Sequence, residues 1–240
     1  MASGTADQAK VAIVTGAGKG MGAGILKKLA ADGYKVAAMS PSGAAKTLAE
    51  SLGGVGTAGS NAKADDIKAL VDLTLDTYGR IDAVVNNTGH PPKGKLLELD
   101  DAAWTTGFEL VHLAVIRMVR LVTPVMLQQK TGGAFVNLLT YATFEPEADF
   151  PISGPVRAAV AAFSKVYADQ YASQGIRMNN VLPGFIDSLP AKDERVARIP
   201  MKRYGTVREI SDTVAFLLSE QASYITGQNI RVDGGITRSV

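Results

Sequence analysis

Short apolar segments alternate with helical segments along almost the whole chain, and this alternation limits the possible folds more than any other feature. The apolar segments have the length of buried strands. They cover residues 11–14, 35–39, 81–85, 134–138, 177–182 and 229–232, with a weaker one within 53–59. Strands that alternate with helices form a parallel sheet covered by helices on both faces. The sequence therefore predicts an α/β fold.

The segments between these strands have helical spacing. Met21, Ile25 and Leu29 recur at four-residue steps, and Asp32–Gly33 ends that helix. A long helix follows residue 100, with Asp100 or Asp101 as its N-cap. Further helices are predicted over residues 41–52, 65–78, 156–171 and 209–219.

Length and composition exclude several classes of protein. The chain has 240 residues, a net charge of +2, two His and no Cys. We expect a loose tail over residues 1–9 and a single domain over 10–240, a size that buries a core without disulfides or metal. The absence of Cys excludes a disulfide scaffold, a thiolate zinc site and a Cys nucleophile. We predict no metal site.

The charge pattern argues against two kinds of partner. Basic residues are scattered rather than clustered, so no nucleic-acid surface is expected. The longest apolar stretches fall short of the about 20 residues that a membrane helix needs, and the N-terminus has no apolar signal core. We therefore expect a cytoplasmic protein without a membrane partner.

Four glycines lie between the first strand and the first helix, at Gly16, Gly18, Gly20 and Gly22. Glycines let the backbone approach phosphate groups, and the helix N-terminus supplies N–H donors. A glycine-rich turn at this position in a βαβ unit favours a dinucleotide, although such turns also occur without a ligand.

Four motifs make a family resemblance specific. The turn reads Thr15-Gly16-xxx-Gly20-x-Gly22, and residues 86–89 read Asn-Asn-Thr-Gly, with Thr88 where the family has Ala. Residues 175–184 and 225–235 supply two further motifs, GIRMNNVLPG and ITGQNIRVDGG. The chain resembles the classical short-chain dehydrogenase/reductase family from about Lys10 to Gly235. The resemblance implies a Rossmann-type doubly wound sheet, a nicotinamide cofactor, a small carbonyl or alcohol substrate, and a homotetramer or homodimer.

The same resemblance assigns the cofactor-binding residues. They are Gly16, Gly18, Lys19, Gly20, Met21, Gly22, Ser40, Ser42, Asn61, Asn87, Thr88, Gly89, Arg157, Pro183, Gly184 and Ile186. Members that prefer NAD carry an Asp where this chain has Ser40, and members that prefer NADP often have a base at Lys19. We expect NADP, with NAD as the alternative, because Ser40 would not repel a 2′-phosphate. The family's Asp near the adenine is also missing, and Ser60–Asn61 stands there.

The family's catalytic Ser, Tyr, Lys and Asn are all replaced. Alignment on the neighbouring motifs puts Thr140 at the Ser, Ser153 at the Tyr and Arg157 at the Lys. His112, or a residue next to it, stands at the Asn. An alkyl hydroxyl is a far weaker acid than a phenol, and a guanidinium does not relay a proton.

Alternative interpretations exist for each replacement. Ser153 either contacts the substrate, or is a helix cap or a neutral replacement, since Ser-Gly-Pro is typical of a helix start. His112 is either catalytic or an ordinary interior residue. Tyr141 is the nearest phenol to the site in sequence, although an extended chain would point it away from Thr140. His90 follows the Asn-Asn-Thr-Gly motif, where a loop either meets substrate or is solvated.

Two functions remain open. One is an NAD(P)-dependent oxidoreductase acting on a small carbonyl or alcohol. The other is a nucleotide-binding sensor, or a silent subunit of an oligomer. The segment over residues 187–200, which the family uses as a lid, is short and charged and does not identify a substrate.

Overall fold

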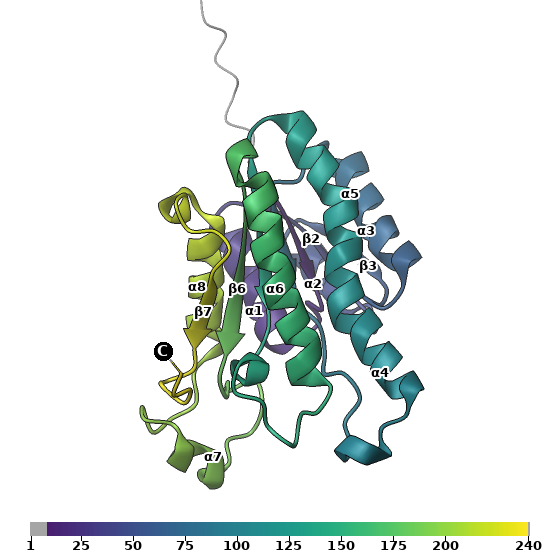
Figure 1. The fold of residues 1–240 in the computed structure, drawn as a ribbon. Coiled ribbons are helices and arrows are strands. Elements are labelled where there is room, and N and C mark those ends of the chain that lie inside the picture. Colours follow the sequence, from purple (N-terminus) through teal and green to yellow (C-terminus); the bar gives the residue numbers. More distant parts are fainter. Residues whose placement is uncertain (1–8, 240) are drawn as a thin grey trace, which may run out of the picture.

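Seven parallel strands form one sheet in the computed structural model, which describes residues 9–239. The strands follow the order β3-β2-β1-β4-β5-β6-β7, so the chain starts near the middle and winds outward twice (Figure 1). Their bounds are β1 Val11–Thr15, β2 Lys35–Ser40, β3 Val55–Ala58, β4 Ala83–Asn86, β5 Gly133–Leu138, β6 Ile176–Pro183 and β7 Asn229–Val232. The order reverses between β1 and β4, which is where open α/β sheets bind ligands. The predicted doubly wound sheet is confirmed, including the weak third strand.

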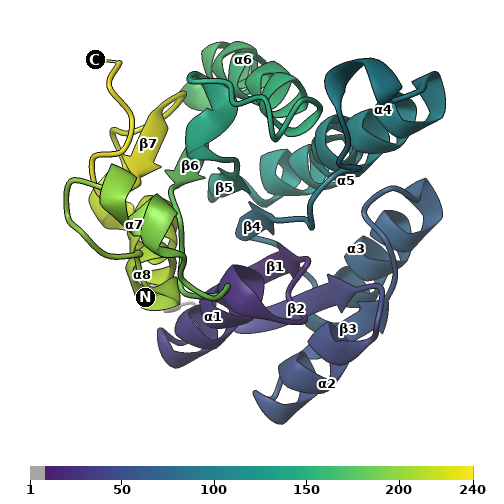
Figure 2. The same cartoon turned by 90° about the horizontal axis from the view of Figure 1, so that it is seen from below.

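Helices cover both faces of the sheet (Figure 2). One face carries α1 Gly20–Ala31, α2 Ala44–Ser51 and α8 Val207–Leu218, and its core includes Ile25, Leu26 and Ile210. The other carries α3 Ala64–Tyr78, α4 Asp101–Phe108, α5 Ala114–Gln129 and α6 Ser153–Tyr171. Residues from these helices pack on Phe135 of β5 in a second core. The predicted tail over residues 1–9 lies outside the described residues, apart from Ala9.

Two helix starts show how local chemistry sets the boundaries. The Asp100 side chain accepts a hydrogen bond from Ala103 N at 2.9 Å, which confirms Asp100 as the N-cap of α4. In contrast, α2 begins at Ala44 rather than at Pro41. Gly43 takes a φ of +74° directly before it, so residues 41–43 form a turn instead of the first helical turn.

One helix contradicts the expectation about apolar length. A π-helical turn, Glu109–Leu113, joins α4 to α5 in one continuous helix over residues 101–129. By length and composition this helix is able to cross a membrane, so the prediction that apolar stretches are too short is wrong here. However, 44% of its most apolar window is buried, and it packs against α3 and α6 as a core helix does. It is a weak candidate for a membrane span.

Four asparagines form a row across the second half of the sheet. Asn86, Asn137, Asn180 and Asn229 stand at paired positions on β4, β5, β6 and β7. Asn86 Nδ2 donates to Asn137 Oδ1 at 2.8 Å, and the next two bonds of the same kind are both 2.9 Å. This asparagine row links β4, β5, β6 and β7 at one register, and its first member, Asn86, ends β4 beside the glycine turn.

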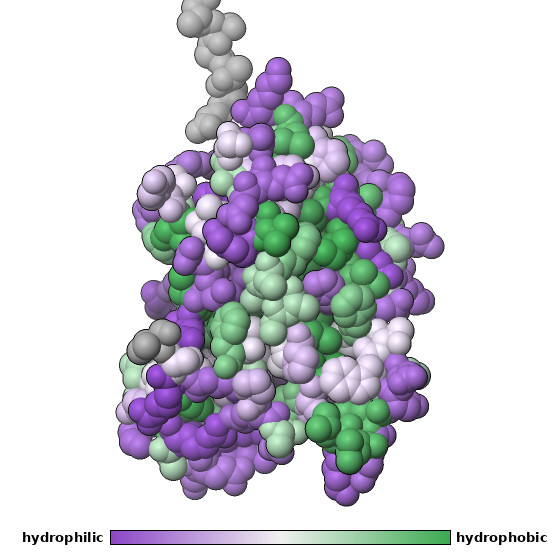
Figure 3. Space-filling view, viewed as in Figure 1, coloured by the Kyte–Doolittle hydropathy of each residue, from purple (hydrophilic) through white to green (hydrophobic). Residues whose placement is uncertain are grey.

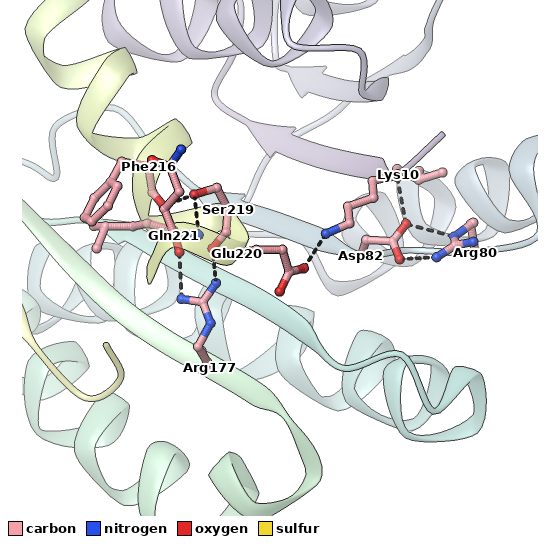
Figure 4. Close-up of polar contacts among 10 residues, drawn as sticks. Lys10, Arg80, Asp82, Arg177, Phe216, Ser219, Glu220 and Gln221 are labelled. Atoms are coloured by element: carbon pink, nitrogen blue, oxygen red, sulfur yellow. Dashed lines mark hydrogen bonds and ion pairs between the residues drawn. The ribbon is translucent and has the colours of Figure 1, made fainter. Parts of the chain in front are cut away.

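Paired charges close the opposite, amino edge of the sheet (Figure 4). Asp82, just before β4, accepts two hydrogen bonds from Arg80, at 2.6 and 2.9 Å, and one from Val11 N at 2.8 Å. Arg177, near the start of β6, donates to the carbonyl oxygens of Leu217, Ser219 and Ile225. This edge thus has partners for its buried charges.

Candidate active site

The glycine turn folds tightly against the end of β4. Gly16 and Gly20 have φ values of +59° and +55°, which favour glycine. A Cβ on Gly22 would lie 2.4 Å from Gly16 O, and one on Gly16 would lie 2.6 Å from Asn87 O. Asn87 Nδ2 donates to Gly16 O at 3.0 Å. The turn therefore has no room for side chains at Gly16 and Gly22, and bare backbone there allows a close approach to phosphates.

A buried network holds the turn in place. Thr15 Oγ1 donates to Asn87 O at 2.8 Å, and Asn61 Nδ2 donates to the same oxygen at 2.9 Å. Asn61 is buried, at 8% exposed, and its side chain holds the residue that follows β4. The sequence predicts that Asn61 stands near the adenine. In the structure, its side chain instead bonds Thr15 and Asn87, which hold the glycine turn.

The end of β2 is uncharged. Gly18 packs on Ser40, because a Cβ there would lie 2.8 Å from Ser40 Oγ. Ser40 Oγ accepts from Ala45 N at 3.0 Å, whereas Ser42 is exposed. Lys19 precedes α1, is exposed and provides no side-chain cap, so the first amides of that helix lack a side-chain acceptor. Nothing in this stretch would repel an extra phosphate.

Ser153 and Arg157 form a buried pair at the start of α6. Arg157 Nη1 donates to Ser153 Oγ at 2.6 Å, and the two residues are 5% and 9% exposed. Arg157 Nε is buried without a partner. Burial lowers the pKa of Arg157 to about 10, so the guanidinium stays charged at neutral pH. Because Ile152 is the N-cap of α6 and Ser153 Oγ makes no cap, the interpretation of Ser153 as a helix cap is wrong.

Thr140 and Tyr141 diverge from each other at the end of β5. Thr140 is extended and half-buried, directly before a 3-10 turn that contacts α6. Tyr141 begins a 3-10 turn, Tyr141–Thr143, and its ring packs 5.3 Å from that of Phe185. Burial raises the pKa of Tyr141 above its usual range, and the charge of Glu147 raises it further. Tyr141 is therefore a poorer acid than an ordinary tyrosine, which argues against it as the proton donor.

His112 also lies away from this centre. Its ring stacks on Phe108, with centroids 4.9 Å apart, and meets the edge of Phe163 at 6.3 Å. Burial lowers the pKa of His112, and its Nδ1 has no partner. Val111, its neighbour in the π-helical turn, lines a small pocket at the ends of β4 and β5 instead. The sequence predicts His112, or a residue next to it, at the position of the family's Asn. It does not single out Val111 as the neighbour that lines the pocket.

His90 lies beside two positive charges, and both of its interpretations stay predictions. It follows β4 on an exposed loop, and burial lowers its pKa, as do the charges of Lys93 and Arg157. Lys93 Nζ stands 6.0 Å from the centre of the Phe150 ring, in the loop that leads into α6. The charges of Lys93 and Arg157, from two segments, therefore reach His90 at this edge of the sheet.

The segment after β6 completes the edge. A Cβ on Gly184 would lie 2.8 Å from Asp233 Cα, which keeps the end of β6 against the chain after β7. Ile186 pairs with Gly205, and Ser188 Cβ would lie 3.3 Å from a Cβ on Gly20. The short helix α7, Asp193–Arg198, is held by an ion pair between Arg198 and Glu147. The charged segment therefore borders the glycine turn.

Comparisons with known proteins agree with this geometry. A family model described as enoyl-(acyl carrier protein) reductase matches residues 16–237. The 3-oxoacyl-[acyl-carrier-protein] reductase FabG of Staphylococcus epidermidis is 33% identical over 95% of this chain and 98% of its own. The 3-oxoacyl-[acyl-carrier-protein] reductase of Synechocystis is 35% identical, over 97% and 98%.

Two solved structures share the fold over nearly their whole length. YwfH, an NADPH-dependent reductase involved in bacilysin biosynthesis, has a TM-score of 0.90 and 26% identity, over 97% of this chain and 100% of its own. The L-sorbose reductase of Gluconobacter frateurii, solved with NADPH and L-sorbose, has a TM-score of 0.89 and 27% identity, over 97% and 98%.

Proposed function

Because the chain belongs to the classical short-chain dehydrogenase/reductase family of oxidoreductases, we propose that it reduces the carbonyl group of a small molecule with NADPH, or oxidises the corresponding alcohol. The observation that carries this proposal is the hydrogen bond of 2.6 Å from Arg157 to Ser153, in a buried centre at the same edge of the sheet as the glycine turn. We expect this reaction to take place in the cytoplasm.

The residues fit NADPH. The turn from Gly16 to Gly22 would hold the pyrophosphate, with the amides of Gly20 and Met21 at the start of α1 as donors. Ser40, Ser42 and Lys19 would meet the 2′-phosphate, since no carboxylate stands at the end of β2. Asn87, Thr88 and Gly89, with Pro183, Gly184 and Ile186, would border the nicotinamide end. The solved reductases described above as NADPH-dependent or NADPH-bound support the same choice.

The buried pair would stabilise the reacting oxygen. When bound, NADPH supplies a hydride to the carbonyl carbon. Ser153 Oγ accepts from Arg157, so its own hydrogen is free to bond the carbonyl oxygen. The charge of Arg157 then stabilises the negative charge that develops on that oxygen, and burial strengthens this effect. Thr140 would orient the substrate.

The proton is expected to come from water. Arg157 stays protonated at neutral pH, and the hydroxyl of Ser153 is a weak acid. Loss of a positioned general acid typically costs about 10²–10⁴ in rate. We therefore expect slow turnover compared with relatives that keep a phenol.

Fluorescence titrations with NADPH and NADH, followed by a carbonyl screen with the tighter form, test this function. Ser153→Ala should lower turnover about 100-fold, as loss of one donor to an oxyanion does, while NADPH affinity stays unchanged. Ser223→Ala, at an exposed serine, is the matched control. Failure to bind either nucleotide would contradict the function.

A second candidate is a nucleotide-binding protein without turnover. It is favoured by Arg157, which cannot pass on a proton, and by Val111, which offers no polar group to the pocket. The double variant Ser153→Tyr with Arg157→Lys separates the two candidates. New activity where the natural protein has none would identify a silent site, whereas loss of an existing activity would identify a working Ser153–Arg157 pair.

The chain is also expected to assemble as a homotetramer or homodimer. Apolar side chains gather over α5 and α6 in Figure 3. Large apolar side chains on α4, α5 and α6 are exposed at Phe108, Leu127 and Val166, the last to 63%. A second copy would bury this surface. Light scattering on the purified protein, before and after Val166→Glu, tests this expectation.

A further inference from the structure

Arg157 is a buried charge with too few partners. A guanidinium has five N–H donors, and Arg157 uses one of them, to the neutral Ser153 hydroxyl. Its Nε is buried without an acceptor, and among residues 9–239 no carboxylate forms an ion pair with it. Buried charges are normally paired, because removing them from water is costly. In the free protein, the Arg157 guanidinium therefore lacks hydrogen-bond acceptors.

The surroundings add positive charge instead of supplying an acceptor. Arg157 lies near the N-terminus of the 19-residue helix α6, the end that carries positive partial charge, and the first turn holds no acidic residue. In the loop after β4, His90 feels the charges of both Arg157 and Lys93, and Lys93 Nζ stands 6.0 Å from the centre of the Phe150 ring. Glu147, in the loop before α6, is already paired with Arg198. Asp149 in that loop is exposed, as is Lys93.

We propose that the site takes a substrate with its own negative charge, a small oxo acid whose carboxylate pairs with the Arg157 guanidinium. Two oxygens of a carboxylate match the planar fork of a guanidinium. Lys93 would attract the same group from the mouth of the site, and Ser153 would then bond the oxo group beside it. The carboxylate site stands on the buried charge alone, whereas reduction of the bound acid rests on the function proposed above.

Matched pairs of acid and ester measure the effect of the charge. Acetoacetate and methyl acetoacetate, or pyruvate and methyl pyruvate, keep the same carbonyl group and differ in one negative charge. A hydrogen bond to a charged group contributes about 1.5–3 kcal/mol, which corresponds to roughly 10- to 150-fold in affinity. We expect calorimetry on the full chain, with saturating NADPH and without nucleotide, to show at least one acid binding over 10-fold tighter than its ester.

Three variants locate the charge that matters. Arg157→Met should abolish the difference between acid and ester, and Lys93→Met should reduce it less, because Lys93 is exposed. Arg208→Met is the matched control, since Arg208 is exposed and pairs only with Asp212 on its own helix. Thermal unfolding of each variant without ligand shows whether it is folded.

The proposal and the proposed function fail in different ways. If NADPH binds and esters are bound and reduced as well as acids, the acid site is overturned while the reductase stands. If an acid binds through Arg157 but no nucleotide binds, the acid site stands and the reductase is overturned. Equal binding of chloride and of both acids would show a site for any anion and would overturn the oxo acid proposal.

Discussion

Two arginines at opposite edges of one sheet differ in how many hydrogen-bond acceptors the chain provides for them. At the amino edge, Arg177 donates at 2.7 Å to Leu217 O, at 3.1 Å to Ser219 O and at 3.4 Å to Ile225 O (Figure 4). At the carboxyl edge, Arg157 is more deeply buried and makes one hydrogen bond. The first is anchored by carbonyl oxygens of the chain. The second is left with a charge that the chain does not satisfy.

This difference separates stability from binding. Asp82 and Arg80 also satisfy each other at the amino edge, so that edge gains stability from its charges. The carboxyl edge carries the glycine turn, the buried guanidinium and the short helix α7. Departures from full satisfaction are expected at functional sites, where a ligand supplies the missing contact.

The largest effect is expected at the amino edge. Asp82→Ala removes a buried carboxylate and leaves Arg80 and Val11 N without this acceptor, so the free energy of unfolding should fall by about 3 kcal/mol. NADPH affinity should not change. Chemical denaturation measures the first and titration the second. Asp212→Ala, which breaks an exposed ion pair, should cost at most about 0.5 kcal/mol. Weaker NADPH binding in folded Asp82→Ala would show that the edges are coupled.

The next effect belongs to the carboxyl edge. Gly22→Ala places a Cβ 2.4 Å from Gly16 O and 2.6 Å from Asn87 Nδ2, so the turn must move. A shift of about 1 Å in a site typically costs about 100-fold. We expect NADPH affinity to fall by this factor, as measured by fluorescence titration. Lys27→Ala on the exposed side of α1 is the control. Unchanged affinity would mean that the turn does not hold the nucleotide.

The smallest effect compares the two arginines directly. Arg177→Met leaves Leu217 O and Ser219 O without this donor, while Ile225 O keeps its bond from Asn179 Nδ2, and stability should fall by about 2 kcal/mol. Arg157→Met removes an unpaired buried charge, and such replacements are often neutral or stabilising, here by about 1 kcal/mol. Thermal unfolding without ligand measures both. A clear loss of stability in Arg157→Met would show that Arg157 holds the fold and would weaken the contrast drawn above.

Most of the fold could be predicted from the sequence, because most strands are short apolar runs and the long helices repeat at three and four residues. Residues 41–43 were assigned to a helix because composition does not show that Gly43 takes a left-handed φ. The uninterrupted apolar stretches fall short of a membrane span because charges such as Arg117 interrupt them, whereas the whole helix over residues 101–129 is long and apolar enough by its average hydropathy.

The site could be predicted in part. The glycine turn and the Ser153–Arg157 pair follow from motif spacing. The directions of His112 and Val111 could not be predicted, because a π-helical turn rotates the side chains relative to an ordinary α-helix. The isolation of Arg157 could not be predicted either, since it depends on which distant carboxylates reach α6. The asparagine row had a signal in the sequence, an Asn within each of four strands.

That row has a polarity. Each amide nitrogen points toward β7 and each amide oxygen toward β4, so the dipoles of the side chains add, and each bond strengthens the next. An amide that rotated alone would face oxygen to oxygen on one side and nitrogen to nitrogen on the other. The four amide groups must therefore all keep the same orientation or all flip together. A substitution at Asn229, on the outer strand, would consequently be felt at Asn86, beside the glycine turn.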